Sequence, residues 1–396
     1  MRTIARTSLE PLRDFLRNER ASSVVLVIAT VIALVWANAA WASYESVWTT
    51  SLRLQIGPWP FGSDARHWIS DAAMALFFFV VGLEIKRELV DGELRTLRRA
   101  ALPVLAAAGG MLVPAVLYLS LNRDGDAARG WGIPMATDIA FAVGVLSLLG
   151  SRVPTGLRVF LLSVAIVDDI GAIAVIALFY TDSINGVSLI TSGLALVAFR
   201  SSWHLPEAPL RSAVLVACGV AAWMLVYQSG VHATIAGVAL ACLVPGGPQA
   251  PAPVARLEHA LHPWTGLVIV PLFALANAGL QLSAGSLAQA AGSPISIGIF
   301  LGLVVGKALG LAGAALLAIR LRIADQPAGV SDQHIVGVSL LGGIGFTVSL
   351  FIAQLAFDDA AAVASAKAGV FAGSLIAGIA GFTVLRWVAG RNSTRE

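Results

Sequence analysis

Long runs of hydrophobic residues, separated by short polar loops, follow one another along nearly the whole chain. Most runs are long enough to cross the apolar core of a bilayer as α-helices, and they do not alternate with the period of two that barrel strands show. The pattern predicts an all-α polytopic membrane protein with twelve transmembrane helices. We place them near residues 23–42, 67–86, 100–120, 130–150, 156–180, 186–200, 211–229, 231–245, 260–280, 295–319, 334–356 and 365–388.

Two of these spans are interrupted by residues that break helices. The fourth contains Gly130–Asp138, with Pro134 and two glycines, and the eleventh contains Leu341–Thr347, with three glycines. Proline removes a backbone hydrogen bond and glycine loosens the helix, so both spans are predicted to be discontinuous. Thr137 is predicted to cap the second half of the fourth span. Asp138 would be stabilised by the positive N-terminal end of a half-helix.

The two interrupted spans occupy corresponding positions in the chain. Spans three to five and ten to twelve are both three-helix units, and each has its broken helix in the middle. The first unit starts on the opposite side of the membrane from the second, so the units are predicted to be inverted repeats. In transporters this arrangement indicates a substrate site near the bilayer midplane.

Composition and charge support the membrane interpretation and set the orientation. The chain of 396 residues is 57% hydrophobic and 12% charged, about half the charged fraction of a soluble domain. With the N-terminus inside, twenty Lys and Arg residues lie in inner loops and five in outer loops, so both termini are predicted to be cytoplasmic. These basic residues lie in short loops, which gives no support for binding of nucleic acid.

Short loops indicate one compact membrane domain over residues 23–388. It would be preceded by a basic cytoplasmic segment, 1–22, and followed by a cytoplasmic tail, 389–396. The outer loop 43–66 has alternating residues and a Gly-Pro turn, which fit either a small hairpin or an irregular loop anchored by tryptophans.

Asp168 and Asp169 stand side by side in the middle of the fifth span, and the nearest other charges are Arg158 and Asp182. Each carboxylate costs about 3 kcal/mol at the bilayer centre on insertion scales. A structural hydrogen bond between helices would explain one such residue but explains two poorly, so we interpret the pair as functional. A carboxylate withdrawn from water binds a proton more readily, and once ionised it offers oxygen ligands to a hard cation. Proton and cation would therefore compete for one site.

Lys307 is the only basic residue deep within a span. A buried ammonium group needs a partner, and the candidates are Asp168, Asp169 and the C-terminal ends of the half-helices. The lysine lies in a stripe of glycines at four-residue spacing, which should let a neighbouring helix approach closely. The stripe consists of Gly298, Gly302, Gly306 and Gly310.

Further titratable residues lie at the predicted ends of spans. Glu84 ends the second span, Glu258, His259 and His262 cluster at the inner end of the ninth, and His232 opens the eighth. The spacing of His259 and His262 fits a metal site, but with no Cys and only a Glu nearby, solvated interfacial histidines explain it better. Because histidine titrates near neutral pH, the histidines are candidates for a pH-sensing role.

Taken together, these motifs resemble those of the NhaA-type sodium/proton antiporters, and the resemblance covers essentially the whole chain. The family is itself a known example of inverted repeats with broken helices, so that argument is not independent of the resemblance. The motifs are Phe78–Leu89, Ala136–Phe141, Ala165–Ala172, Ser229–Thr234, Leu257–Trp264 and Gly343–Thr347.

The resemblance implies that the fourth and eleventh helices cross at the ion site. It implies that Asp169 is the main carboxylate for sodium and protons, that Asp168 shares the sodium site and pairs with Lys307, and that Asp138 and Thr137 complete the charge balance. It assigns the pH response to positions matching Glu84, Glu258, His259, His262 and His232. It also implies a homodimer through the outer loop 43–66, and no cofactor.

We therefore expect an electrogenic Na⁺(Li⁺)/H⁺ antiporter of a bacterial inner membrane, regulated by pH, and no enzyme. The alternatives are a cation channel or a proton-coupled symporter of an organic solute. A symporter would need aromatic or arginine side chains near the midplane to bind an organic solute, and the sequence has few there. An intramembrane aspartyl protease is disfavoured, because two adjacent aspartates on one helix cannot face each other as a catalytic dyad.

Overall fold

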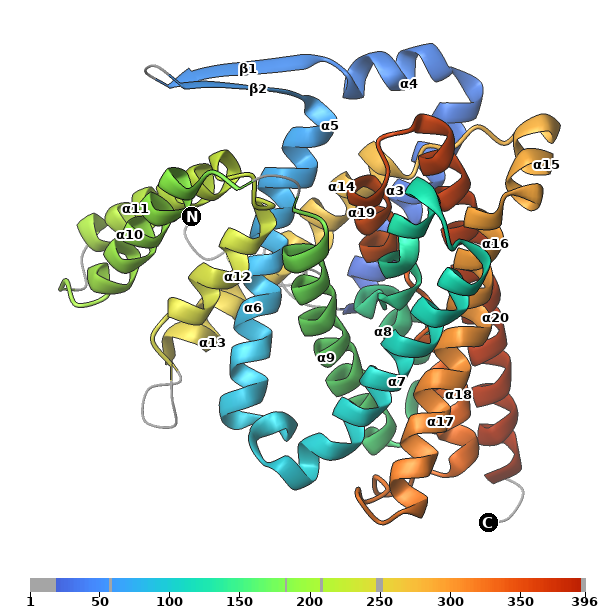
Figure 1. Ribbon diagram of the computed structural model, residues 1–396. Helices are drawn as coiled ribbons and strands as arrows, with labels where there is room; N and C mark the ends of the chain where they lie inside the picture. The colour runs from blue at the N-terminus through green and yellow to red at the C-terminus, as the bar shows by residue number, and fades with distance from the viewer. Residues whose placement is uncertain (1–18, 57–58, 182–183, 207–208, 247–251, 393–396) are drawn as a thin grey trace, which may run out of the picture.

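The computed structural model describes residues 19–56, 59–181, 184–206, 209–246 and 252–392, and this part of the chain is almost entirely helical (Figure 1). It contains eight helices long and apolar enough to cross a membrane, two bent helix pairs and two shorter apolar helices. Together they correspond one to one to the predicted spans. The predicted segment 1–22 lies almost wholly outside the described residues, and the tail 389–396 lies partly outside them.

Several spans are built from consecutive helical pieces. In chain order the spans are α3 (Glu19–Ala39), α5–η1–α6 (Ala65–Trp68, Ile69–Ala73, Met74–Asp91), α7 (Leu97–Leu121), η3 with α8 (Gly125–Met135, Ile139–Ser147), α9 (Thr155–Phe179), α10 (Gly186–Ser202), α11 (Pro209–Gln228), α12 (Thr234–Leu243), α13–η5–α14 (Ala252–Trp264, Thr265–Ile269, Val270–Asn277), α16–η6–α17 (Pro294–Leu301, Gly302–Gly306, Lys307–Arg320), α18 with α19 (Asp332–Leu341, Phe346–Ala356) and α20 (Ala360–Asn392). The pieces η1, η5 and η6 are π-helical turns, and η3 is a 3₁₀-helix. Short helices η2 (Glu93–Arg95), η4 (Gly150–Arg152), α4 (Trp41–Trp48) and α15 (Ala284–Gly292) lie in the connections. Helix α20 continues through Asn392, so the predicted tail from residue 389 begins as helix.

The two predicted interruptions are confirmed. Helix η3 bends by 41° into α8, and α18 bends by 47° into α19. Helix η3 enters from the end of α7, whereas α18 enters from the other side of the molecule, through the α17–α18 connection at the bottom of Figure 1. The two broken helices therefore run in opposite directions, as inverted repeats require.

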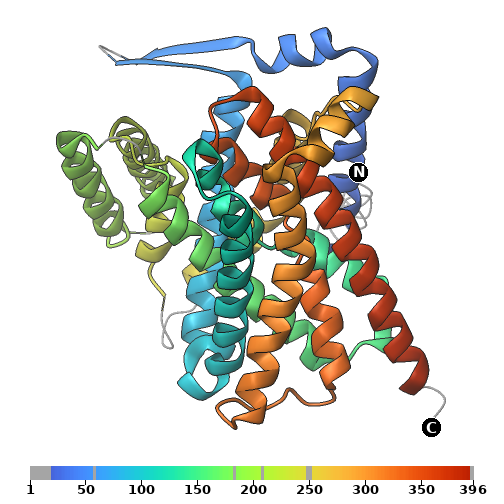
Figure 2. The same cartoon turned by 45° about the vertical axis from the view of Figure 1, so that its right-hand side comes forward.

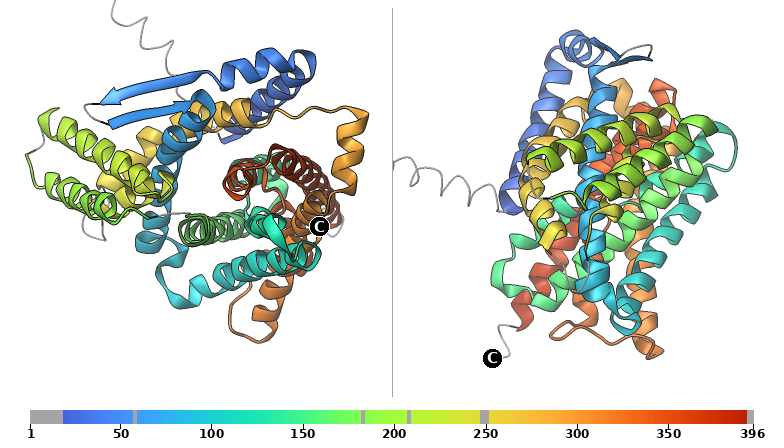
Figure 3. Two further views of the ribbon diagram at one scale, coloured as in Figure 1. Left: turned by 45° about the horizontal axis from the view of Figure 1, so that its top comes forward. Right: turned by 90° about the vertical axis from the view of Figure 1, so that its left-hand side faces the viewer.

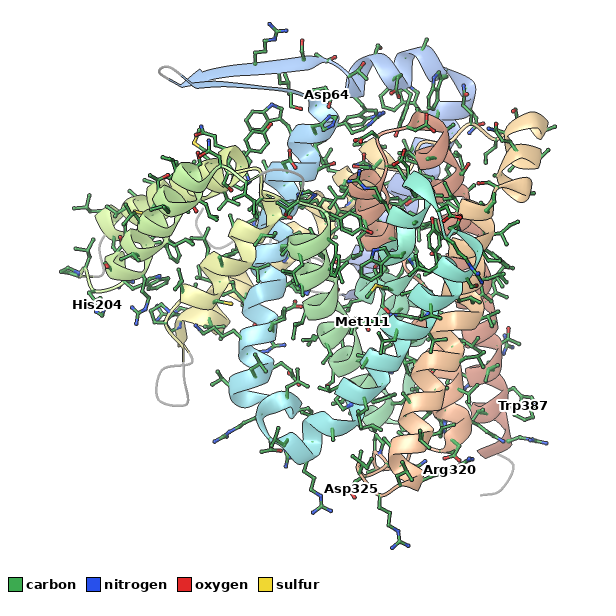
Figure 4. The ribbon with its side chains drawn as sticks, in the orientation of Figure 1. Asp64, Met111, His204, Arg320, Asp325 and Trp387 are labelled. Atoms are coloured by element: carbon green, nitrogen blue, oxygen red, sulfur yellow. The ribbon has the colours of Figure 1, made fainter. Side chains whose placement is uncertain are left out.

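The loop over residues 43–66 contains a hairpin, which was one of its two predicted structures. Strands β1 (Ser51–Ile56) and β2 (Trp59–Asp64) pair antiparallel and project sideways from the helices (Figure 2). The Asp64 carboxylate caps α5 by accepting from the amide of His67 at 2.8 Å. We call this side of the molecule the hairpin side. Figure 4 places Asp64 there and places Arg320 and Asp325 on the opposite side.

The helices form two groups, which the left view of Figure 3 shows obliquely from the hairpin side. In the right view α10 and α11 lie in front. The core bundle comprises α7, η3–α8, α9, α16–α17, α18–α19 and α20, and its most extensive contact joins α7 to α17. The flanking group comprises α3, α6, α10–α12 and α13–α14, joined mainly by α6 with α12, α10 with α11, and α3 with α14.

The predicted close approach of a neighbouring helix to the glycine stripe is confirmed, and that helix is α7. Its glycines face α7, and a Cβ atom added at any of them would collide with α7 or η3. Gly310 lies against the backbone carbonyl of Gly109, so no side chain fits between the two helices there. The contacts are Gly298 with Tyr118 and Asn122, Gly302 with Pro134, Gly306 with Pro114, and Gly310 with Gly109.

Candidate ion-binding site

The two adjacent aspartates of α9 are both buried, with 1% exposure for Asp168 and 3% for Asp169. Successive residues on an α-helix point about 100° apart, so the two carboxylates have different surroundings. Asp168 Oδ2 lies 2.6 Å from Lys307 Nζ and accepts a hydrogen bond from the Thr137 hydroxyl at 2.7 Å. The structure thus brings together the lysine, the threonine and the first aspartate that the sequence selected.

Asp138 joins the second halves of both broken helices. Its Oδ1 accepts from the amide of Phe141, in the first turn of α8, at 3.0 Å. Its Oδ2 accepts from the amide of Thr347, in the first turn of α19, at 3.0 Å, and from the hydroxyl of the same residue. One carboxylate therefore caps two helix N-termini, where a negative charge is stabilised.

The prediction that Thr137 caps α8 is wrong, because the capping residue is Asp138. Thr137 instead places its hydroxyl 2.7 Å from Asp168 and 2.8 Å from the carbonyl of Gly342, where α18 ends. A hydroxyl has one hydrogen, so it can donate to only one of these acceptors at a time.

The remaining half-helix ends meet positive or donating groups. Lys307 Nζ donates to the carbonyl of Met135, the last residue of η3. Carbonyls at a helix C-terminus carry partial negative charge, and an ammonium group stabilises them. Negative charge thus lies at the two N-terminal ends and positive charge at a C-terminal end. This arrangement allows four helix ends to meet inside the molecule.

Asp169 faces a cavity of about 500 Å³. Thr137, Asp138 and Thr347 line its inner end, and the side chains of Glu84, Glu258 and His262 line it farther out. The cavity reaches Glu93, in the turn between α6 and α7, so it is directed away from the hairpin. Among the described residues, the Asp169 carboxylate has no hydrogen-bond partner, so this carboxylate is the one that is free to take a ligand from the cavity.

The residues predicted to respond to pH do not all lie together. Glu258 pairs with Arg87, and His262 Nε2 lies 3.9 Å from Glu84 Oε1, both along the cavity wall. His259 is exposed on α13 and does not line the cavity. His232 lies before α12, also away from it. Within the described part of the chain, no three His, Cys, Asp or Glu side chains are grouped as a metal site.

Several neutral hydroxyl groups at the crossing have no counterpart in the sequence prediction. Thr347 bonds to Asp138, the Ser349 hydroxyl donates to the carbonyl of Ile133 at 2.7 Å, and the Ser374 hydroxyl accepts from the amide of Phe346 at 3.2 Å. A serine or threonine within an apolar span costs little to insert, so hydropathy carries no signal for such residues. The nearest available signal was the position of Thr347 two residues after the last glycine of the cluster in the eleventh span.

Two oppositely directed broken helices, a buried acidic pair at their crossing and a cavity directed to one side define a secondary ion transporter with many membrane passes. Comparison with known proteins identifies the family. The family model described as Na⁺/H⁺ antiporter 1 matches residues 13–385. The chain is 49% identical over 384 residues to the Na⁺/H⁺ antiporter NhaA of Bordetella parapertussis, covering 95% of this chain and 96% of that protein. It is 46% identical over 401 residues to the protein of the same name from Rhodospirillum rubrum, covering 98% and 100%. The chain belongs to the Na⁺/H⁺ antiporter 1 family, whose members are transporters rather than enzymes and use no cofactor.

Proposed function

We propose that the protein exports Na⁺ or Li⁺ in exchange for protons, with Asp169 as the exchanging carboxylate and Asp168 completing the sodium site. The observation that carries the proposal is the difference between the two aspartates. Asp168 is held by Lys307 and Thr137, whereas Asp169 faces the cavity without a hydrogen-bond partner among the described residues. A sodium ion entering the cavity therefore meets a buried carboxylate, the oxygen ligand that hard cations prefer.

Exchange follows from competition at this carboxylate. A buried carboxylate is neutral when it holds a proton, and it binds a cation only after the proton has left. Sodium binding from one side thus releases protons, and protons arriving from the other side release sodium. Because two carboxylates share the site, more protons than cations can cross in a cycle, which makes the exchange electrogenic.

The orientation is part of the proposal. The excess of Lys and Arg in the loops of one side supports cytoplasmic termini in a bacterial inner membrane. The cavity would then be directed to the cytoplasm, and the hairpin would lie outside. Glu84, Glu258 and His262 line the cavity and support a pH response that acts on cation entry. The projecting hairpin supports a homodimer formed through residues 43–66.

The decisive experiment measures sodium-driven proton movement in everted vesicles. We expect Asp169→Asn to abolish the exchange with both Na⁺ and Li⁺, because the amide cannot alternate between a proton and a cation. Asp325→Asn is the matched control, since Asp325 lies on the surface in an exposed pair with Arg98 and should leave exchange unchanged. Exchange that persists in Asp169→Asn would contradict the assignment. Cation flux without proton movement in the unaltered protein would indicate a channel.

A further inference from the structure

On the hairpin side of the ion site, helix α19 of the core bundle packs against α14 of the flanking group, and one of its aromatic rings also meets α6. Phe351 of α19 lies between two aromatic rings, 5.6 Å from Phe78 of α6 and 6.1 Å from Phe273 of α14 between ring centroids. Phe351 is one helical turn beyond Thr347 and Val348, which line the inner end of the cavity. This aromatic layer therefore separates the cavity from the hairpin side.

A layer of hydrogen bonds between neutral side chains follows one turn farther along α19. Gln354 Nε2 donates to Asn277 Oδ1 at 2.6 Å, and the Ser70 hydroxyl donates to Gln354 Oε1 at 3.1 Å. Asn277 is the last residue of α14, and Ser70 lies in the π-helical turn η1 that leads into α6. Gln354 thus joins the core bundle to both of these flanking helices.

The Asn277 side chain is incompletely satisfied in this arrangement. It is fully buried, at 0% exposure, and its Nδ2 has no hydrogen-bond partner. A buried donor without a partner destabilises the state that contains it. Separation of α19 from α14 would admit water to Asn277 and remove this penalty, so the contact is weaker than a fully satisfied amide pair of the same kind.

We propose that Gln354, Asn277 and Ser70 form a latch that closes the hairpin side while the cavity is directed to the opposite side. The inference rests on the proposed exchange, which requires the site to face each side in turn. The latch joins the two helix groups at the point where they must separate, and the unmet Asn277 donor lets it open at modest cost.

The first test measures which side of the membrane can reach the site. A Val348→Cys reporter is introduced after Cys218 and Cys242 are replaced by serine, and a membrane-impermeant thiol reagent is applied to vesicles of each orientation. Loss of one hydrogen bond shifts an equilibrium by about fivefold. We therefore expect Asn277→Leu, which removes one such bond, to raise the reaction rate from the hairpin side by about that factor relative to the rate from the opposite side. Gln354→Leu removes two bonds and should raise this ratio further.

Asn122→Leu is the matched control. Asn122 is also a buried amide, but its Nδ2 bonds to the carbonyls of Tyr118 and Pro294, both within the core bundle. It should leave the ratio of labelling rates unchanged. The latch is contradicted if Gln354→Leu and Asn277→Leu leave the ratio unchanged, or if Asn122→Leu shifts it equally. The labelling rate reports how accessible residue 348 is from each side of the membrane and does not depend on ion exchange. The latch can therefore be refuted even if the proposed function is correct, and the reverse also holds.

The second test locks the latch and holds even if the leucine variants fold poorly. A double variant, Asn277→Cys with Gln354→Cys, is joined by a reducible bifunctional thiol reagent. We expect the cross-link to stop sodium-driven proton movement and reduction to restore it, while each single cysteine variant is unaffected by the reagent. A cross-linked protein that continues to exchange ions would overturn the proposal.

Discussion

The ammonium group of Lys307 lies 2.6 Å from Oδ2 of Asp168, and neither side chain is exposed to solvent. Removing one member of a buried ion pair leaves the other charge without compensation, which typically costs about 3–5 kcal/mol. We therefore expect Lys307→Met to lower the thermal unfolding midpoint in detergent strongly. The double variant with Asp168→Asn should recover most of the loss, because it removes both charges. Equal midpoints for the single and double variants would contradict this pairing.

Asp138→Asn should destabilise the crossing more than Thr347→Val does. The amide of the asparagine can still accept at one helix N-terminus, but its NH₂ group faces donors of Thr347 at the other. Leaving buried donors unpaired costs about 1–3 kcal/mol, whereas loss of the Thr347 hydroxyl alone removes one hydrogen bond worth about 1 kcal/mol. Thermal unfolding of the two variants side by side measures the difference. The reverse order would show that the hydroxyl, and not the helix cap, dominates.

Gly310→Ala should reduce stability and the yield of folded protein. Its new Cβ would collide with the Gly109 carbonyl of α7, and overpacking of this kind costs about 1–3 kcal/mol. Gly313, on the same helix, has open space where a Cβ would lie. Gly313→Ala should therefore be neutral, or slightly stabilising because alanine favours helix. Fluorescence-detected size exclusion of both variants after heating compares them directly, and equal losses would exclude the backbone contact as the cause.

The ion pair between Glu45 of α4 and Arg66 at the start of α5 should give a pH-dependent contribution to stability. Both carboxylate oxygens of Glu45 accept from Arg66, at 2.9 and 2.8 Å. These hydrogen bonds lower the pKa of Glu45 below its usual 4.5. The stabilisation is fully present above that usual value and is lost as the pH falls through the lower pKa of the folded state. We expect the stability advantage over Glu45→Gln, below about 1 kcal/mol for a partly exposed pair, to be constant above pH 4.5 and to shrink only in more acidic buffer. Melting curves of both proteins across this range test it, and an advantage that grows on acidification would refute the pairing.

Charged residues within spans made the central part of the site predictable from sequence. A carboxylate or ammonium group in an apolar helix is expensive, so each such residue must find a partner. This argument left Asp168, Asp169 and the ends of the half-helices as candidate partners of Lys307, and the resemblance to the antiporter family selected Asp168. In the structure Lys307 meets both Asp168 and the carbonyl at the end of η3. The broken helices were visible for a similar reason, because proline and clustered glycines are unfavourable inside a helix.

The sequence did not predict hydrogen-bond partners that are fixed only by how the helices bend and pack. The cap of α8 fell one residue from its predicted position, because Thr137 and Asp138 are both good capping residues and only the bend decides between them. The residues Gln354 and Asn277 gave no signal, since an amide near a helix end is ordinary in sequence. Glu258 pairs with Arg87. Arg87 follows the predicted second span, so the sequence suggests a loop residue, and only the packing of α6 against α13 shows that it meets Glu258.

The π-helical turn η6 reduces the rotation of the glycine stripe around the axis of α16–α17. Residues four apart in an α-helix drift by about 40° around the axis, so four glycines at that spacing would spiral through about 120°. A π turn holds more residues per turn, so four residues within it fall short of a full revolution and the drift reverses sign. Because η6 spans Gly302–Gly306, the middle interval of the stripe, it offsets part of this drift and keeps Gly310 within about 50° of the azimuth of Gly298. Deletion of one residue in η6 would therefore rotate Lys307 and Gly310 away from their neighbours by about 100°, although every amino acid in the site would still be present.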